Sequence, residues 1–246
     1  MPGLLALVGG DEFKAGNEAQ DRLMVDAAGP GPAFVVPTAA ARQGPDQAVA
    51  QATRWFRTLG LELRELPVLK RTDAMNASIA AHAREGGFFY LVGGDPGHVV
   101  QVLRGSAVWS AIFGAWRDGA ALAGSSAGAM ALCSHTLVRA TWPNRFRRRP
   151  LAALGVVPKT AVLPHFDTFG HRWIESAEEA APELTLLGIE ERSAVVWGPR
   201  ADRAGGYWRA VGPGTVTVVR EGKTRRFAAG QEVSGVRVPA RMLPSR

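Results

Sequence analysis

The stretch over residues 120–132 constrains the fold of this chain more than any other part of the sequence. Its first four residues are apolar and fit a short buried strand, and its last four fit the first turns of a helix. Between them, Gly124-Ser125-Ser126-Ala127-Gly128 matches the pattern G-x-S-x-G, a sharp strand-to-helix turn that exposes its serine. We take Ser126 as a candidate nucleophile. The alternative is a tight crossing packed by small residues.

The composition is that of a folded globular protein. The chain has 246 residues, of which 46% are hydrophobic and 21% charged, enough for one large α/β domain, alone or with an appendage. A single cysteine, Cys133, excludes an internal disulfide and a cysteine-based metal site, so we expect a reducing compartment and a buried thiol. No apolar run is long enough for a signal peptide or a membrane span, and we therefore expect a cytoplasmic protein without membrane contact.

Positive charge is concentrated after the candidate nucleophile. The net charge is +7 with a pI near 10.4, and no carboxylate occurs between Asp118 and Asp167. The cations of this interval are Arg139, Arg145, Arg147, Arg148, Arg149 and Lys159. Their field attracts anions, so an acidic substrate or a nucleic acid is compatible with it.

Apolar segments alternate with helical patterns through the first half of the chain. This alternation predicts a mostly parallel sheet with helices on both faces, a flavodoxin-like α/β fold. The expected strands are 4–8, 33–36, 61–66, 88–92 and 120–123, and the expected helices are 18–28, 46–59, 73–84 and 99–117, the last in two pieces because of Gly105-Ser106. The pairs Gly9-Gly10, Pro37-Thr38 and Gly93-Gly94 then lie with Ser126 at the carboxyl ends of strands, where sites form in such sheets.

The pattern changes after Pro150. Short strands are expected at 161–163, 184–189 and 194–197, with a helix at 172–181. Beyond Tyr207 the chain consists of β segments at 208–211, 215–220 and 225–228 separated by Gly-rich turns. We therefore expect a single domain over residues 1–246, in which 205–246 is a β-rich C-terminal extension.

A nucleophilic serine needs a base, and five histidines compete for that role. His165 directly follows a predicted strand, which is where a base for Ser126 should lie. His82 is expected on a solvent-facing helix, His135 at or just past the end of the elbow helix, and His98 near the site but within a helix. We predict His165 as the base.

Chain order limits the choice of the acid. In α/β-hydrolases the acid lies between the serine and the histidine, but no Asp or Glu occurs between Ser126 and His165. With His171 as the base, only Asp167 would fit that order. Otherwise the acid follows the histidine or precedes the serine, and Glu190 and Glu191 at the end of a predicted strand are the downstream candidates.

Several segments together resemble one family. Gly124-Ser125-Ser126-Ala127-Gly128-Ala129 resembles the G-x-S-A-G-A motif of the serine peptidases that include cyanophycinase and aspartyl dipeptidase, which have the class I glutamine amidotransferase-like fold. Val35-Val36-Pro37-Thr38-Ala39 and Leu91-Val92-Gly93-Gly94-Asp95 resemble two further strand ends of that family, and Gly188-Ile189-Glu190-Glu191 resembles its G-I-D-E segment. These markers occur in order over about residues 5–200. By this resemblance Ser126 is the nucleophile, His165 the base and Glu191 the acid.

The oxyanion of such a mechanism needs backbone donors. We expect the N–H of Ala127 and one from Gly93 or Gly94, positions where side chains would obstruct the approach. Asp95 is expected either to bind a substrate amine or to stabilise its own turn.

The sequence departs from cyanophycinases near the site. Pro96 follows Asp95 where they carry Gln, Leu163-Pro164 precedes His165-Phe166 where they carry D-Q, and only Arg172 lies close downstream where they are arginine-rich. Cyanophycin is therefore not the expected substrate, and serine at position 126 argues against the glutaminase chemistry of the cysteine-containing relatives.

Together these features predict a serine-type peptidase acting on small or β-linked acidic peptides, with no metal and no organic cofactor. A homodimer is compatible with the sequence, and nucleic acid is not expected as a partner. The alternative is a catalytically silent domain that holds an acidic partner or nucleic acid through the basic segment 145–149, in which Phe146 lies among arginines. In a peptidase, the segment 145–149 would cover the site and attract carboxylates. In a silent binding domain it would be the binding surface. The simplest interpretation is a solvated basic loop.

Overall fold

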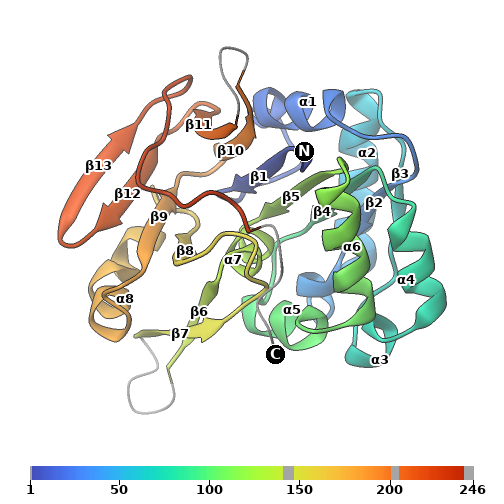
Figure 1. Ribbon diagram of the computed structural model, residues 1–246, viewed down its shortest axis with the longest axis horizontal. Helices are drawn as coiled ribbons and strands as arrows, with labels where there is room; N and C mark the ends of the chain where they lie inside the picture. The colour runs from blue at the N-terminus through green and yellow to red at the C-terminus, as the bar shows by residue number, and fades with distance from the viewer. Residues whose placement is uncertain (1, 141–146, 201–204, 241–246) are drawn as a thin grey trace.

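The central sheet runs in the order β11-β10-β1-β5-β4-β2-β3 in the computed structural model, which describes residues 2–140, 147–200 and 205–240 (Figure 1). The strands β3, β2, β4, β5 and β1 are parallel to one another, and β10 and β11 add an antiparallel edge. The bounds are β1 (Leu5–Val8), β2 (Ala33–Val36), β3 (Leu63–Glu65), β4 (Phe88–Leu91), β5 (Ala121–Ser125), β10 (Ala194–Pro199) and β11 (Gly206–Val211). The predicted mostly parallel α/β sheet is confirmed.

Helices cover both faces of this sheet because the strands alternate apolar side chains between two cores. Ala6 and Val8 of β1 pack on the face of α1 (Glu18–Asp26) and α2 (Pro45–Thr58), which supply Met24 and Phe56. Leu5 and Leu7 belong to the other core. The elements on that side are α3 (Arg71–Ala74), α4 (Ala77–Arg84), α5 (Pro96–Leu103), α6 (Ala107–Arg117) and α7 (Ala127–Leu132), and a 3-10 turn, η1 (Thr38–Ala40), follows β2.

The predicted interruption of the helical region 99–117 is confirmed. Helix α5 ends at Leu103, Gly105 has a positive φ of 63°, and the Ser106 hydroxyl caps α6 by accepting the N–H of Trp109.

Among the described residues, no helix is both long and apolar enough to cross a membrane.

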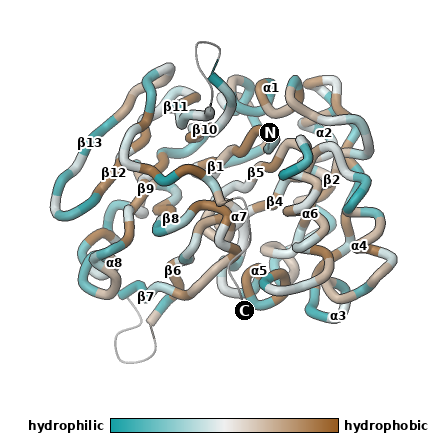
Figure 2. Tube along the Cα trace, viewed as in Figure 1, coloured by the Kyte–Doolittle hydropathy of each residue, from teal (hydrophilic) through white to brown (hydrophobic). Residues whose placement is uncertain are grey.

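A second sheet, in the order β13-β12-β9-β8, lies beside the first (Figure 1). Its strands are β8 (Thr160–Leu163), β9 (Thr185–Ile189), β12 (Val216–Arg220) and β13 (Lys223–Phe227), with η2 (Gly170–Trp173) and α8 (Ile174–Ala180) between β8 and β9. The edge strand β13 is mostly hydrophilic, whereas β1 and β4 in the central sheet are hydrophobic (Figure 2). The segment predicted as a C-terminal extension is therefore shared: β11 joins the central sheet, and β12 and β13 join the second.

A hairpin replaces the expected basic loop after the elbow helix. Helix α7 ends at Leu132, Cys133 is extended, and the chain enters β6 (His135–Arg139), which pairs antiparallel with β7 (Arg148–Ala152). His135 lies just past the end of the elbow helix, as predicted. The prediction of a solvated loop at Arg148 and Arg149 is wrong, because these residues belong to a paired strand. Arg145 and Phe146 lie outside the described residues.

Candidate active site

The turn between β5 and α7 has a conformation that only small neighbours permit. Ser126 has φ 48° and ψ −111°, a strained geometry that raises its side chain above the sheet edge. A Cβ on Gly124 would lie 2.6 Å from the carbonyl carbon of Gly128, and one on Gly128 would lie 2.2 Å from the carbonyl oxygen of Leu91. Both glycines of the motif are therefore required by backbone contact.

A chain of hydrogen bonds begins at this serine. Ser126 Oγ lies 3.1 Å from Nε2 of His165, and His165 Nδ1 lies 2.7 Å from Oε1 of Glu191. The carboxylate can only accept, so Nδ1 carries the proton and Nε2 is left as the acceptor for the serine hydroxyl. The side chains of His165 and Glu191 are 20% and 23% exposed, and His165 lines the adjoining cavity.

The position of His165 is held by its neighbours. Its N–H donates to the carbonyl of Gly9 at 2.7 Å, and its ring stacks on Phe169 at 4.9 Å between centroids. A Cβ on Gly10, whose φ is 115°, would lie 2.3 Å from Cε1 of the imidazole. The glycine pair after β1 therefore makes room for the ring.

The two neighbouring acids point in different directions. Glu190 accepts the hydroxyl and the backbone N–H of Thr215 at 2.6 and 2.8 Å. Glu191 contacts His165, and its own N–H donates to Oδ1 of Asp167 at 3.0 Å. Successive side chains leaving a strand alternate in direction, which explains the division.

The other histidines lie away from Ser126 Oγ. His98, in α5, and His171, in η2, each contact a backbone carbonyl at 2.9 Å. His82 is exposed on α4, as expected. His135 lies on β6, where burial and the nearby Arg104 lower its pKa against the opposing effect of Glu183.

The two glycines after β4 have different roles. The N–H of Gly93 donates to Oε1 of Glu12 at 2.9 Å, while Oε2 of the same carboxylate accepts the hydroxyl of Ser125 at 2.9 Å. The N–H of Gly93 therefore already has an acceptor, which favours Gly94 among the two glycines predicted as oxyanion donors. The N–H of Gly94 has no protein acceptor among the described residues, and its φ of 138° and the nearby carbonyl of Ala39 exclude a side chain.

Glu12 was not among the predicted site residues. Glu12 lies two residues beyond the glycine pair that follows β1. This position could have identified it as a site residue, because the carboxyl ends of parallel strands meet at one edge of the sheet.

A cavity of about 990 Å³ opens over Ser126 and His165. Among the described residues, three arginines line it: Arg139 and Arg148 from the hairpin, and Arg172 from η2. The Arg148 guanidinium lies 4.0 Å from the ring centre of Trp173, and burial together with the charge of Arg139 lowers its pKa. The cavity therefore favours negatively charged ligands.

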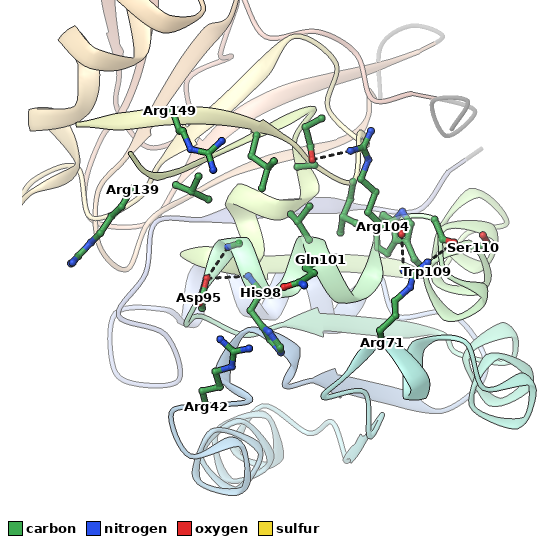
Figure 3. A pocket seen from close by; sticks show the side chains of 18 residues that line it. Arg42, Arg71, Asp95, His98, Gln101, Arg104, Trp109, Ser110, Arg139 and Arg149 are labelled. Atoms are coloured by element: carbon green, nitrogen blue, oxygen red, sulfur yellow. Dashed lines mark hydrogen bonds between the residues drawn. The ribbon is translucent and has the colours of Figure 1, made fainter. Parts of the chain in front are cut away.

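Asp95 lies at the rim of this cavity and caps α5. Its Oδ1 accepts the N–H groups of Gly97 and His98 at 2.9 and 3.0 Å (Figure 3). These hydrogen bonds stabilise the turn, which is one of the two roles predicted for Asp95 from the sequence.

No cluster of three or more His, Cys, Asp or Glu side chains that could hold a metal ion occurs in the described ranges. Cys133 is buried, and burial raises the pKa of its thiol, which keeps it protonated.

Comparison of the chain with known proteins identifies its family. The model of peptidase family S51 matches residues 4–199. The crystal structure of a peptidase from an acI-B1 Actinobacterium superposes with a TM-score of 0.80 at 29% identity, covering 95% of this chain and 97% of the other. A Listeria monocytogenes EGD-e protein assigned as peptidase E shares the fold, with a TM-score of 0.55 at 17% identity over 89% of this chain and 99% of its own. A comparison with curated proteins gives no significant match. The family match spans all the strand ends around Ser126, and the chain therefore belongs to peptidase family S51, serine hydrolases of peptide bonds with the class I glutamine amidotransferase-like fold.

Proposed function

We propose that this peptidase cleaves small or β-linked acidic peptides through an acyl-enzyme on Ser126, with His165 as the general base and Glu191 as the acid that orients it. The observation that carries the proposal is the hydrogen-bonded chain from Ser126 through His165 to Glu191, of which Ser126 and His165 line a cavity together with arginines.

The first half-reaction forms a covalent ester. Ser126 Oγ attacks the scissile carbonyl carbon while Nε2 of His165 takes its proton. The tetrahedral intermediate then collapses, the C–N bond breaks, and the imidazolium returns the proton to the leaving amine. Glu191 holds the Nδ1–H tautomer and stabilises the imidazolium.

The second half-reaction hydrolyses the ester. Water attacks the acyl carbon with His165 again as base, and Ser126 Oγ leaves with the proton returned by the imidazolium. Each tetrahedral oxyanion would receive the N–H groups of Ala127 and Gly94, because the N–H of Gly93 is held by Glu12. None of these steps requires a metal ion or an organic cofactor.

The substrate class follows from the cavity. Arg139, Arg148 and Arg172 would form charge-assisted hydrogen bonds with substrate carboxylates, whether these are side chains or a peptide terminus. The volume of about 990 Å³ suits a peptide of a few residues.

The test combines active-serine labelling with cleavage assays. A fluorophosphonate probe should label the native enzyme and the Ser78→Ala control, which removes an exposed serine on α4, but not Ser126→Ala. Acidic dipeptides and tripeptides, in α- and β-linked forms, should be cleaved faster than their amide counterparts. Labelling that persists in Ser126→Ala would move the nucleophile elsewhere. An unlabelled native protein that binds nucleic acid in a salt-dependent manner would favour the silent binding domain.

A further inference from the structure

A second cavity of about 1140 Å³ lies beside the first and takes no part in the proposed reaction. It is bounded by α5, the start of α6 and the β6–β7 hairpin (Figure 3). Asp95, Val138 and Arg139 line both cavities, so the two adjoin one another. A substrate held at Ser126 can therefore extend over Asp95 toward this second space.

The lining of the second cavity is strongly positive. Among the described residues, five arginines and one carboxylate, Asp95, line it, and Oδ1 of Asp95 already accepts two backbone N–H groups. Two of the arginines have backbone partners: Arg71 donates to three carbonyls around the end of α5, and Arg104 contacts the carbonyl of Ala152 at 3.5 Å.

The guanidinium groups of the remaining three, Arg42, Arg139 and Arg149, have neither a hydrogen bond nor an ion pair within the described part of the chain. Arg149 extends from the hairpin and Arg42 from the segment after η1, on opposite sides of α5 in the view of Figure 3. Guanidinium groups placed around one space without carboxylate partners create a field that attracts anions.

A buried donor points to a ligand independently of charge. Trp109 lines the cavity and is 1% exposed, yet its indole Nε1 has no acceptor in the ranges that the structure covers. Burying an N–H without an acceptor is unfavourable, so such groups normally find a partner. Trp116, on the same helix, donates its Nε1 to the carbonyl of Gly3 at 3.0 Å. A carboxylate oxygen in the cavity would supply the acceptor that Trp109 lacks.

We infer that the second cavity is a subsite for acidic side chains of a peptide that extends from Ser126, so that the preferred substrates carry carboxylates beyond the residue next to the scissile bond. The inference rests on the proposed function, since it treats the adjoining cavity as a peptidase site. Apolar side chains of Val100, Leu151 and Leu154 would cover the methylene groups of such residues, while the guanidinium groups meet their carboxylates.

The first arm of the test measures binding without hydrolysis. In the Ser126→Ala background, an acidic hexapeptide of Asp and Glu should bind, as measured by calorimetry, and its amide counterpart of Asn and Gln should bind at least about tenfold more weakly. Arg42→Gln combined with Arg149→Gln should lower the affinity for the acidic peptide by roughly tenfold and reduce its dependence on salt. Arg84→Gln, which removes an exposed cation at the end of α4 outside both cavities, should leave it unchanged.

A second readout locates the ligand. The acidic peptide should shift the indole ¹⁵N–¹H resonance of Trp109, assigned with Trp109→Phe, and leave that of Trp116 in place. Equal binding by the double arginine variant, or no shift at Trp109, would overturn the subsite. Tighter binding of an oligonucleotide than of the acidic peptide, with the same dependence on Arg42 and Arg149, would overturn it in favour of a phosphate ligand.

The third arm separates this inference from the proposed function. With the active enzyme, the ratio of kcat/KM for an acidic hexapeptide to that for an acidic dipeptide should fall in the double arginine variant and stay constant in Arg84→Gln. If neither peptide is cleaved although the hexapeptide binds, the proposed function is wrong and the anion site stands. If both are cleaved with an unchanged ratio, the subsite alone is wrong.

Discussion

The two adjoining cavities differ in how their polar groups are partnered. Around Ser126, His165 lies between a hydroxyl and a carboxylate, Glu191 is fixed by Asp167, and Gly93 is held by Glu12. Around Trp109, three guanidinium groups and an indole N–H have no hydrogen-bond or ion-pair partner in the described chain. The first region is organised before any substrate arrives, as acyl-transfer chemistry requires, whereas the second is left for a ligand to complete. Changes in the first should therefore act on turnover, and changes in the second on affinity.

The largest effect on turnover should come from removing His165, the central residue of the hydrogen-bonded chain at Ser126. His165→Ala removes the base that contacts Ser126 Oγ, and we expect turnover to fall by about 10⁴ or more. Because the two residues act as one unit, the Ser126→Ala, His165→Ala double variant should lose little more than either single variant. Single-turnover and steady-state rates measure this. A comparable loss in His98→Ala would assign the base elsewhere.

The adjacent acids Glu190 and Glu191 allow a second test of whether changes at the organised site act on turnover. Glu191→Gln keeps the size of the side chain but no longer stabilises the imidazolium, so kcat should fall by about 10²–10⁴. Glu190→Gln should act on stability instead, because its partner is Thr215. Measuring kcat and the melting temperature of both variants separates the roles. A greater loss of kcat in Glu190→Gln would exchange them.

A smaller effect on turnover is expected at Glu12. Glu12→Ala removes the acceptor of both Gly93 N–H and Ser125 Oγ, so it should loosen the backbone that presents the Gly94 N–H and lower kcat by about tenfold. Two lost hydrogen bonds should also lower the free energy of unfolding by about 1–3 kcal/mol.

Glu85→Ala, an exposed acid at the end of α4, is the control for Glu12→Ala. An unchanged kcat in Glu12→Ala together with a lowered melting temperature would show that the glycine turn does not depend on this carboxylate for catalysis.

The smallest effect on turnover is expected at a buried acid on the opposite face of the sheet, where the change concerns stability alone. Burial raises the pKa of Asp21 from 3.8 to about 7, helped by the charges of Glu12 and Glu18 and opposed by the hydrogen bond from Trp55. The folded state therefore keeps a proton that the unfolded chain releases near pH 3.8. Stability present below that pH is lost as the pH rises through about 7, by roughly 4 kcal/mol at most.

Chemical denaturation between pH 4 and 8 tests this expectation. Asp21→Asn should remove most of the decline, and Asp26→Asn, an exposed acid at the end of the same helix, should retain it. A native profile that rises with pH over this range would contradict the assignment.

The sequence predicted the parts of the site that short backbone patterns dictate. G-x-S-x-G predicts the sharp strand-to-helix turn found at Ser126, strand ends meet at one edge of a parallel sheet, and alternation along a strand separates Glu190 from Glu191. Each of these depends on residues close together in the chain or on a general rule of sheets.

The features that were missed depend on distant partners. The N–H of Gly93 is taken by a carboxylate 81 residues away, which no local pattern reveals. The β6–β7 hairpin carries mixed polar and apolar residues with Pro150 inside a strand, so its pairing is decided by contact with neighbouring elements. Arg148 and Arg149 could be recognised as charges, but not as residues of two different cavities.

The location of β1 has a consequence for the order of assembly. The first strand of the chain lies inside the central sheet, where Leu5 is paired with Leu122 on one side and with Trp197 on the other. Contacts so distant in sequence carry a high entropic cost of loop closure and form late in folding. Gly9, whose carbonyl accepts a hydrogen bond from the N–H of His165, follows β1 directly. We therefore expect a chain emerging from the ribosome to gain its catalytic geometry only after the strand at 194–199 has been synthesised, so that an incomplete peptidase has no hydrolytic activity.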